Sequence, residues 1–262
     1  MPRPLITLTT DFGLSDHFVA SMKGVILGIS PGAEIVDVSH DVAPYGIAEA
    51  AFIISQAYAD FPKKTVHVVV IDPGVGTSRR PLLVTAAGQY FIAPDNGVLS
   101  MVYSREKHSV RAITNTRYFR RPVSDTFHGR DIFAPCAARL AKGASAAGFG
   151  KPVRDYIRLA LDRPARAGER AWNGTVLKID RFGNVITNFL ASEFAAVRTR
   201  RFSLTAGARE ITAFARTFAE CAPGEIFALA GSAGFLEIAM NQGSAARELG
   251  VAAGAPLSLA IY

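Results

Sequence analysis

Cysteine is scarce in this sequence, which contains only two among its 262 residues. Cys136 and Cys221 lie far apart and form neither a C-x-x-C pair nor the dense cysteine pattern of a small disulfide-stapled domain. We therefore expect two reduced thiols in a reducing compartment, with no structural disulfide and no zinc site. An H-E-x-x-H segment is missing as well, so the sequence gives no indication of a metal.

Long hydrophobic runs are also missing. The most apolar stretches are interrupted by Gly, Pro or a charged residue well before the roughly 18 apolar residues that a membrane span requires. The start of the chain, Met1 to Pro4, leads into an apolar segment at 5–8 that is too short for a secretory signal and lacks a small-residue cleavage pattern. We expect a soluble, cytoplasmic protein that does not associate with membranes.

Acidic residues are fewer than basic ones, at 22 Asp and Glu against 29 Lys and Arg, which gives a net charge of +7. Such an excess can indicate a nucleic-acid partner, because Lys and Arg release counterions when they meet phosphates. Here the basic residues are spread along the chain, and the densest groups lie apart, at 117–121, 154–170 and 198–201. We interpret them as solvated surface and expect no nucleic-acid partner.

The first part of the chain alternates two kinds of pattern. Short β-branched runs are followed by segments in which apolar residues recur at helical spacing. The strongest strand signal is 66–71, whose unbroken apolar character predicts burial on both faces of a sheet. Strands alternating with helices predict an α/β domain with a largely parallel sheet over residues 1–160. The predicted strands are 5–10, 35–38, 66–71, 82–85 and 90–93, and the predicted helices are 18–30, 47–61 and about 131–143.

The composition changes after Gly148. Residues 151–172 are rich in Arg and Pro and show no periodicity, so we place a domain boundary between about 150 and 172. Beyond it, short strand-like runs are separated by Gly-rich turns, which predicts a smaller all-β sandwich or barrel over residues 172–262. The predicted strands are 175–179, 185–189, 202–205, 226–230, 235–239 and 256–262.

Two predicted strands of the first part end in polar loops that contain glycine, and loops at strand ends are common ligand sites in α/β sheets. One loop begins at Asp11, and the other, 72–80, begins at Asp72. Taken singly, Asp72 before Pro-Gly fits an ordinary turn, and Arg79 fits a solvated side chain. His128 in the segment TFHGRD fits a surface histidine near a helix start. Their combination is more informative than any member.

The sequence resembles the S-adenosylmethionine (SAM) hydroxide adenosyltransferases, the hydrolase relatives of the fluorinases and chlorinases. The resemblance covers almost the whole chain. It implies hydrolysis of SAM to adenosine and L-methionine without a cofactor, an N-terminal α/β domain, a C-terminal β-barrel domain, and a homotrimer with active sites between subunits. Seven ordered segments carry it: 10–13 (TDFG), 35–40 (IVDVSH), 71–80 (IDPGVGTSRR), 94–97 (PDNG), 126–131 (TFHGRD), 179–185 (IDRFGNV) and 236–241 (LEIAMN).

Site residues follow from the same resemblance. In the hydrolases of the family an Asp, an Arg and a His act together on a water molecule, and the matching positions are Asp72, Arg79 and His128. The substrate-binding positions are Asp11 at the ribose hydroxyls, Asp180 at the methionine amine, Asn184 at the adenine edge, Phe182 and Phe218 near the adenine faces, and Ser232 near the methionine carboxylate.

Two departures separate this chain from the halogenases. The arginine that they place beside the methionine carboxylate is not matched, since Ala233 follows Ser232. They also carry hydroxyl-bearing residues at the positions of Asp72, Val75 and Gly129, and a desolvated halide would need such donors. Water is therefore favoured as the nucleophile, because a carboxylate can accept its proton and the sulfonium leaves as a neutral thioether without a general acid.

Two alternatives remain open at this point. One is halogenation of SAM. The other is a non-catalytic regulator that binds adenosine or SAM, which would keep Asp11, Phe182 and Asn184 but would not need the three catalytic residues.

Overall fold

The computed structural model describes residues 3–161 and 163–262 of the chain. It forms two compact units, Met1–Leu159 and Ala160–Tyr262, which are described separately below. Met1 and Pro2, which belong to the N-terminal segment expected to carry no secretory signal, lie outside the described residues. Within the described ranges, no helix has the length and apolar character needed to cross a membrane.

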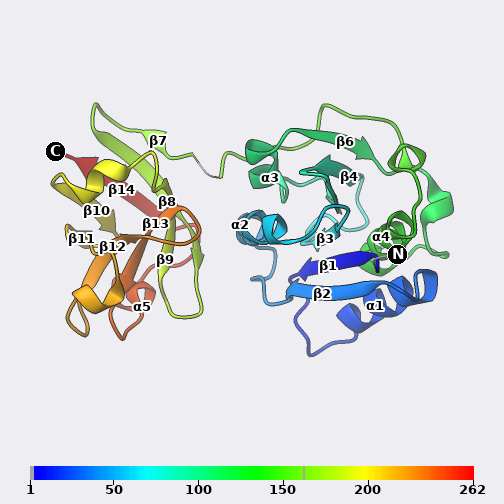
Figure 1. Cartoon of the computed structure of the whole chain (residues 1–262), viewed down its shortest axis with the longest axis horizontal. Helices are drawn as coiled ribbons and strands as arrows, with labels where there is room; N and C mark the ends of the chain where they lie inside the picture. Colours follow the sequence, from blue (N-terminus) through cyan, green and yellow to red (C-terminus); the bar gives the residue numbers. More distant parts are fainter. Residues whose placement is uncertain (1–2, 162) are drawn as a thin grey trace. The chain divides into compact units, whose positions relative to one another are not determined.

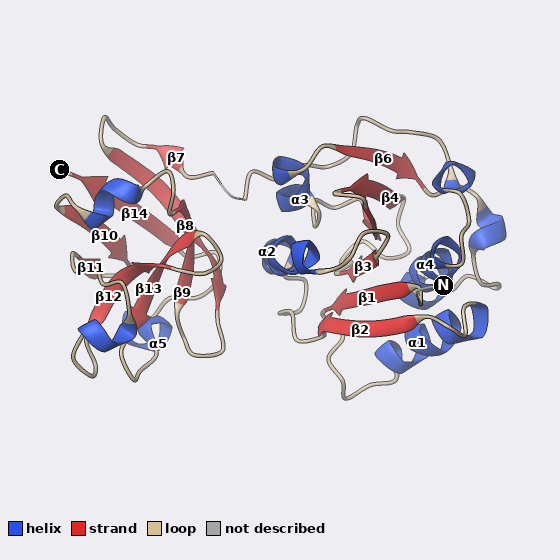
Figure 2. Cartoon of the chain, viewed as in Figure 1, coloured by secondary structure: helices blue, strands red, loops and turns tan. Residues whose placement is uncertain are grey.

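The N-terminal unit has three layers, with helices on both faces of a six-stranded sheet of order β2-β1-β3-β5-β4-β6 (Figures 1 and 2). One core joins the sheet to α1 and α4, and a second joins the other face to α2 and α3. The strands are β1 (Leu5–Thr10), β2 (Glu34–Ser39), β3 (Val66–Val70), β4 (Pro81–Ala86), β5 (Gln89–Pro94) and β6 (His108–Ala112). The helices are α1 (Phe18–Ile29), α2 (Ile47–Ala57), α3 (Ser100–Arg105) and α4 (Ala134–Ala141).

This sheet is mixed, and the prediction of a largely parallel sheet therefore misses one strand. The pairs β2-β1, β1-β3 and β3-β5 are parallel, whereas β4 runs antiparallel to both β5 and β6. A two-residue turn joins β4 to β5, with positive φ at both Ala87 (53°) and Gly88 (75°). Such a short turn can only join antiparallel strands. The sequence Ala-Gly is a weak hairpin signal, so the reversal was not predicted.

Strand β3 lies in the middle of this sheet and is buried along its whole length. Val66, Val68 and Val70 belong to the core shared with α1 and α4, whereas Val69 and Ile71 belong to the core shared with α2 and α3. The predicted burial on both faces is confirmed. A central strand of this kind gives the loop that follows it a rigid support.

A buried histidine in β3 makes the stability of this unit depend on pH. His67 is fully buried, its Nδ1 lies 2.7 Å from Thr7 Oγ1, and its ring stacks on Phe91. Burial lowers the pKa of His67 from 6.5 to about 4. Between these two values the unfolded chain binds a proton that the folded chain does not. The contribution of His67 to the free energy of unfolding is therefore complete above pH 6.5 and is lost as the pH drops toward about 4.

We expect this single group to remove about 3 kcal/mol from the free energy of unfolding across that interval, at 1.36 kcal/mol per pKa unit. Urea unfolding of the wild type and of His67→Gln at the two ends of the interval measures the difference. The variant should lose less stability on acidification than the wild type, whereas the exposed-site control His17→Gln should behave as the wild type. Parallel losses in all three proteins would contradict the assignment.

The C-terminal unit is all-β apart from one short helix, α5 (Ala245–Leu249), and short 3-10 turns. Its strands pair antiparallel in the order β11-β10-β14-β8-β9-β13-β12, with β7 paired to β8. Phe214, just beyond β11, bridges to Ala228 of β12, so the sheet is nearly closed around one core. The strands are β7 (Ala165–Arg166), β8 (Ala171–Ile179), β9 (Val185–Leu190), β10 (Phe202–Ala206), β11 (Arg209–Ile211), β12 (Ile226–Ala230), β13 (Phe235–Met240) and β14 (Pro256–Ile261).

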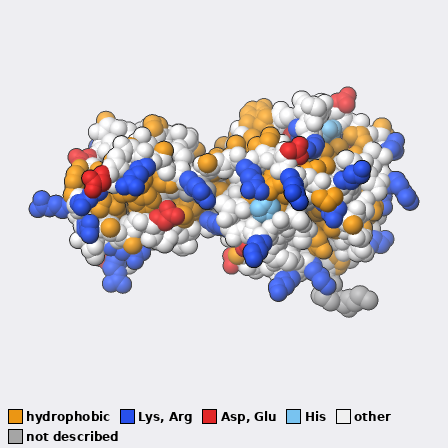
Figure 3. Space-filling model, turned by 90° about the horizontal axis from the view of Figure 1, so that it is seen from above, with side chains coloured by type: hydrophobic (Ala, Val, Ile, Leu, Met, Phe, Trp, Pro, Cys, Tyr) orange, Lys and Arg blue, Asp and Glu red, His pale blue; other side chains and the backbone are white. Residues whose placement is uncertain are grey.

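Basic side chains do not gather into one patch on the face shown in Figure 3. Lys and Arg are dispersed over each unit, with hydrophobic and uncharged side chains between them. This distribution agrees with a solvated surface, and the expectation of no nucleic-acid partner stays a prediction.

Candidate active site

The loop after β3 brings Asp72 and Arg79 into a paired arrangement. Their side chains are only 6% and 9% exposed, respectively. Arg79 Nε donates to Asp72 Oδ1 at 2.8 Å, and Arg79 Nη2 donates to Asp72 Oδ2. Two parallel charge-assisted hydrogen bonds fix both the position and the orientation of the carboxylate.

Gly76 allows this loop to approach the segment that precedes His128. Its φ is +77°, and a Cβ at this position would lie 2.3 Å from the carbonyl oxygen of Asp125. Only glycine tolerates both the backbone conformation and the close approach. As a result Arg79 Nη2 lies 2.8 Å from His128 Nδ1, although 49 residues separate them in sequence. Asp72, Arg79 and His128 form one hydrogen-bonded chain.

The same contact fixes the protonation of His128, which precedes a π-helical turn at Gly129–Phe133 that leads into α4. A guanidinium can only donate hydrogen bonds, so Nδ1 must be the acceptor and the neutral ring carries its proton on Nε2. Burial and then the charge of Arg79 lower the pKa of His128 below its usual value of 6.5. His128 is therefore a neutral imidazole with an Nε2–H donor at neutral pH.

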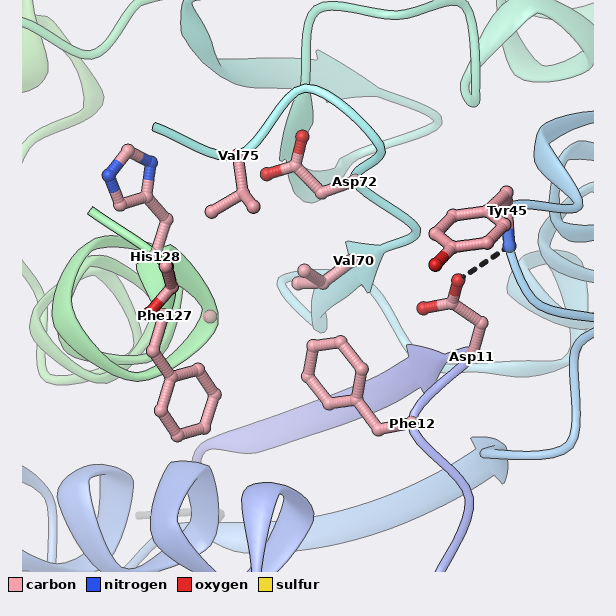
Figure 4. A pocket seen from close by; sticks show the side chains of 10 residues that line it. Asp11, Phe12, Tyr45, Val70, Asp72, Val75, Phe127 and His128 are labelled. Atoms are coloured by element: carbon pink, nitrogen blue, oxygen red, sulfur yellow. Dashed lines mark hydrogen bonds between the residues drawn. The ribbon is translucent and has the colours of Figure 1, made fainter. Parts of the chain in front are cut away.

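A cavity of about 120 Å³ lies where β1 and β3 end, and both Asp72 and His128 line it. Asp11 also lines it, together with apolar side chains that include Phe12 and Phe127. Figure 4 shows His128 and Asp11 at opposite ends of this pocket, with Asp72 between them. Arg79 is not part of the wall and acts on the pocket only through its two partners.

Asp11 is held by a residue that the sequence did not indicate. Its Oδ2 accepts a hydrogen bond from the backbone N–H of Tyr45 at 2.8 Å. Tyr45 has a positive φ of 66° and also lines the pocket. No periodic pattern or motif in the surrounding loop marks it, so only coordinates could reveal this contact. The second carboxylate oxygen of Asp11 has no hydrogen-bond partner within the described part of the chain, which leaves it available to a hydroxyl group.

The C-terminal unit contains the other predicted site residues. In the turn between β8 and β9, Asp180 Oδ1 accepts from the backbone N–H groups of Phe182 and Asn184 at 2.8 and 2.9 Å. Asp180 Oδ2 accepts from Asn184 Nδ2 at 2.8 Å. This network folds the turn tightly and leaves the Phe182 ring 79% exposed.

A second pocket, of about 480 Å³, is lined by Phe182, Asn184 and Phe218. Met240 and Gln242 also line it and were not predicted. Two aromatic rings beside a side-chain amide suit a flat, polar-edged base such as a purine.

The predicted residues thus fall into two sets, one in each unit. Ser232 lies in the turn between β12 and β13, and neither Ser232 nor Asp180 is part of the wall of the second pocket. Within residues 3–161 and 163–262, no three His, Cys, Asp or Glu side chains are arranged to hold a metal ion.

Sequence profiles of one family match both units. The profile of the SAM hydroxide adenosyltransferase N-terminal domain matches residues 6–150, and that of the C-terminal domain matches residues 174–258.

Individual relatives and solved structures agree with these profiles. Proteins named (R)-S-adenosyl-L-methionine hydrolase are 39% identical in Salinispora tropica, covering 97% of this chain and 96% of the relative, and 37% identical in Thermus thermophilus, covering 98% and 99%. A fluorinase of an Actinoplanes species is 30% identical over 71% of each chain. The crystal structure of an uncharacterized conserved protein from Thermotoga maritima is 38% identical, with a TM-score of 0.90 over 97% of this chain and 99% of the other.

Proposed function

The chain belongs to the SAM hydroxide adenosyltransferase family, and from this membership we propose that it hydrolyses SAM to adenosine and L-methionine at the pocket lined by Asp72 and His128. Relatives that carry the name of this hydrolase align over nearly the full chain. The observation that carries the mechanism is the hydrogen-bonded chain of Asp72, Arg79 and His128, whose two end members line one cavity.

The reaction is a displacement at C5′ of the ribose. The oxygen of water forms a bond to C5′ while the C5′–S bond breaks, and the electron pair of that bond stays on sulfur, which leaves as the neutral thioether of methionine. Asp72 accepts the proton that water loses, as a general base. His128 Nε2–H is a donor that can hold the water oxygen. Arg79 fixes the positions of Asp72 and His128 through its hydrogen bonds to both. Holding the water in place lowers the entropic part of the barrier.

The remaining predicted residues would bind the substrate. The free carboxylate oxygen of Asp11 suits the ribose hydroxyls, and the pocket lined by Phe182, Asn184 and Phe218 suits adenine. Asp180 would hold the methionine amine and Ser232 the methionine carboxylate.

We also propose the homotrimer with active sites between subunits that the family resemblance implies. The size of the cavity beside Asp72 supports this proposal. At about 120 Å³ it is smaller than the roughly 300 Å³ at which ligand pockets usually begin, so this cavity alone is too small to enclose the substrate. Light scattering on the purified protein should give three times the mass of the chain.

We propose a cytoplasmic location as well, and the two free cysteines are in keeping with it.

Halogenation of SAM is the nearer alternative, and the packing around Gly129 counts against it. A Cβ at Gly129 would lie 3.2 Å from Met22 Sδ and 3.4 Å from the Phe12 ring. A hydroxyl-bearing side chain at this position would therefore require its neighbours to move. Val75 supplies only apolar surface to the same pocket, so the hydroxyl donors that distinguish halogenases at these positions are replaced by hydrogen and methyl groups.

Incubation of the purified protein with SAM tests the proposal. Chromatography should show adenosine and L-methionine formed in equal amounts, with no halogenated nucleoside when chloride or fluoride is added. A halogenated product would favour the halogenase, and tight binding of SAM without turnover would favour the non-catalytic regulator.

A further inference from the structure

Glu237 is a carboxylic acid in β13 that none of the roles above uses. The residue is only 8% exposed. No side chain or backbone group in the described part of the chain forms a hydrogen bond or ion pair with its carboxyl group. A carboxylate with little access to water and no hydrogen-bond partner is unfavourable, so Glu237 is suited to a cationic partner from outside the chain.

The Glu237 carboxyl group lies against the turn that carries Ser232. A Cβ at Gly231, the first residue of this turn, would fall 1.7 Å from Glu237 Oε1 and 2.1 Å from its Cδ. The absence of a side chain at Gly231 therefore creates the space that the carboxyl group occupies. Glu237 thus lies beside the turn expected to contact the amino-acid end of SAM.

Asp180 is close to the same carboxyl group. Glu237 pairs with Ile186 of β9, and β9 pairs in turn with β8, which ends immediately before Asp180. Burial, and then the negative charge of Asp180, raise the pKa of Glu237 to about 7. Glu237, Ile186 and Lys178 lie opposite one another on three neighbouring strands, and Lys178 is the other charged residue in this row. Two acidic groups therefore face one region of the C-terminal unit.

Asp180 alone is poorly equipped to hold an ammonium group. Its carboxylate already accepts three N–H groups from Phe182 and Asn184. An ammonium group presents three donors and needs several acceptors once it leaves water. Glu237, which has no hydrogen-bond or ion-pair partner among the described residues, can supply the acceptors that Asp180 lacks.

We propose that Glu237 is a second acceptor for the α-ammonium group of SAM and shares that group with Asp180. This assignment rests on the proposed function. The incoming positive charge offsets the repulsion between the two acids, so Glu237 releases its proton to solvent when the substrate binds. The pair also selects for substrates that carry a free amino group, because a neutral group in its place would leave the two acids unpaired.

The variant Glu237→Gln tests this role, because it keeps the shape of the side chain and removes its charge. Calorimetry at about pH 7.5 should show SAM binding at least tenfold more weakly, as expected for a lost hydrogen bond to a charged group. A sulfonium nucleoside without the amino group should lose no affinity in the variant, because it has no ammonium group for Glu237 to accept from. Glu210→Gln, at an exposed position in β11, serves as the matched control and should bind SAM as the wild type does.

A second readout separates recognition from folding. Wild-type affinity for SAM should rise by up to about tenfold between about pH 6 and 7.5 as Glu237 ionises, and Glu237→Gln should lack this rise. The assignment is overturned if the variant binds SAM as tightly as the wild type, or if it weakens the amino-free nucleoside equally. Wild-type turnover of SAM, measured in parallel, shows whether the proposed function survives such a result.

Discussion

Asp72→Asn is expected to lower kcat for SAM hydrolysis by about 10²–10⁴-fold, the range associated with loss of a general base. Asparagine has nearly the shape of aspartate, and its carbonyl oxygen can still accept the hydrogen bond from Arg79 Nε. It cannot accept a proton from water. Binding of SAM should therefore change little, and the loss should appear in single-turnover formation of adenosine.

The control for this variant is Asp60→Asn, which removes an exposed carboxylate from the same unit and should leave the rate unchanged. A loss smaller than about tenfold in Asp72→Asn would show that Asp72 anchors the loop without taking the proton. Loss of SAM affinity together with rate would place Asp72 among the binding residues instead.

Much of the fold could be predicted because its signals are local. The strands β1 and β3 and the helix α1 were predicted to within one residue at each end, since apolar runs and the breakers Pro31 and Gly32 mark their limits. The elements that were missed have weak signals of their own. Helix α3 has six residues, and β6 includes the polar residues His108, Ser109 and Arg111. Their conformation depends on packing against the rest of the sheet.

Part of the candidate site could also be predicted from local signals, and part could not. Asp11 and Asp72 follow β1 and β3, which are adjacent and parallel, so their loops lie at one edge of the sheet and both residues line one pocket. The contact between Arg79 and His128 depends on the approach of the loop at Gly76 to Asp125, which no sequence spacing specifies. The roles of these residues, and of those in the C-terminal unit, stay predictions.

Arg79→Met is expected to have the largest effect on stability, lowering the free energy of unfolding by about 3–5 kcal/mol, the cost of removing one partner from a buried ion pair. The reason is the burial of both side chains, since Asp72 would remain 94% buried without its counterion if nothing else moved. Urea unfolding of the two proteins at neutral pH measures the difference. Lys23→Met is the matched control, because Lys23 and Asp37 form a pair whose side chains are 32% and 37% exposed. Its cost should not exceed about 1 kcal/mol.

The double variant Asp72→Leu, Arg79→Met separates the structural cost from the catalytic one. Replacing both members of a buried pair by apolar side chains removes the uncompensated charge, so much of the lost stability should return. Hydrolysis should not return, because the Asp72 carboxylate that accepts the proton from water is gone. Equal stability of Arg79→Met and Lys23→Met would mean that solvent reaches Asp72 more freely than its burial indicates. Joint recovery of stability and turnover in the double variant would mean that the pair only holds the loop in place, and that the base lies elsewhere.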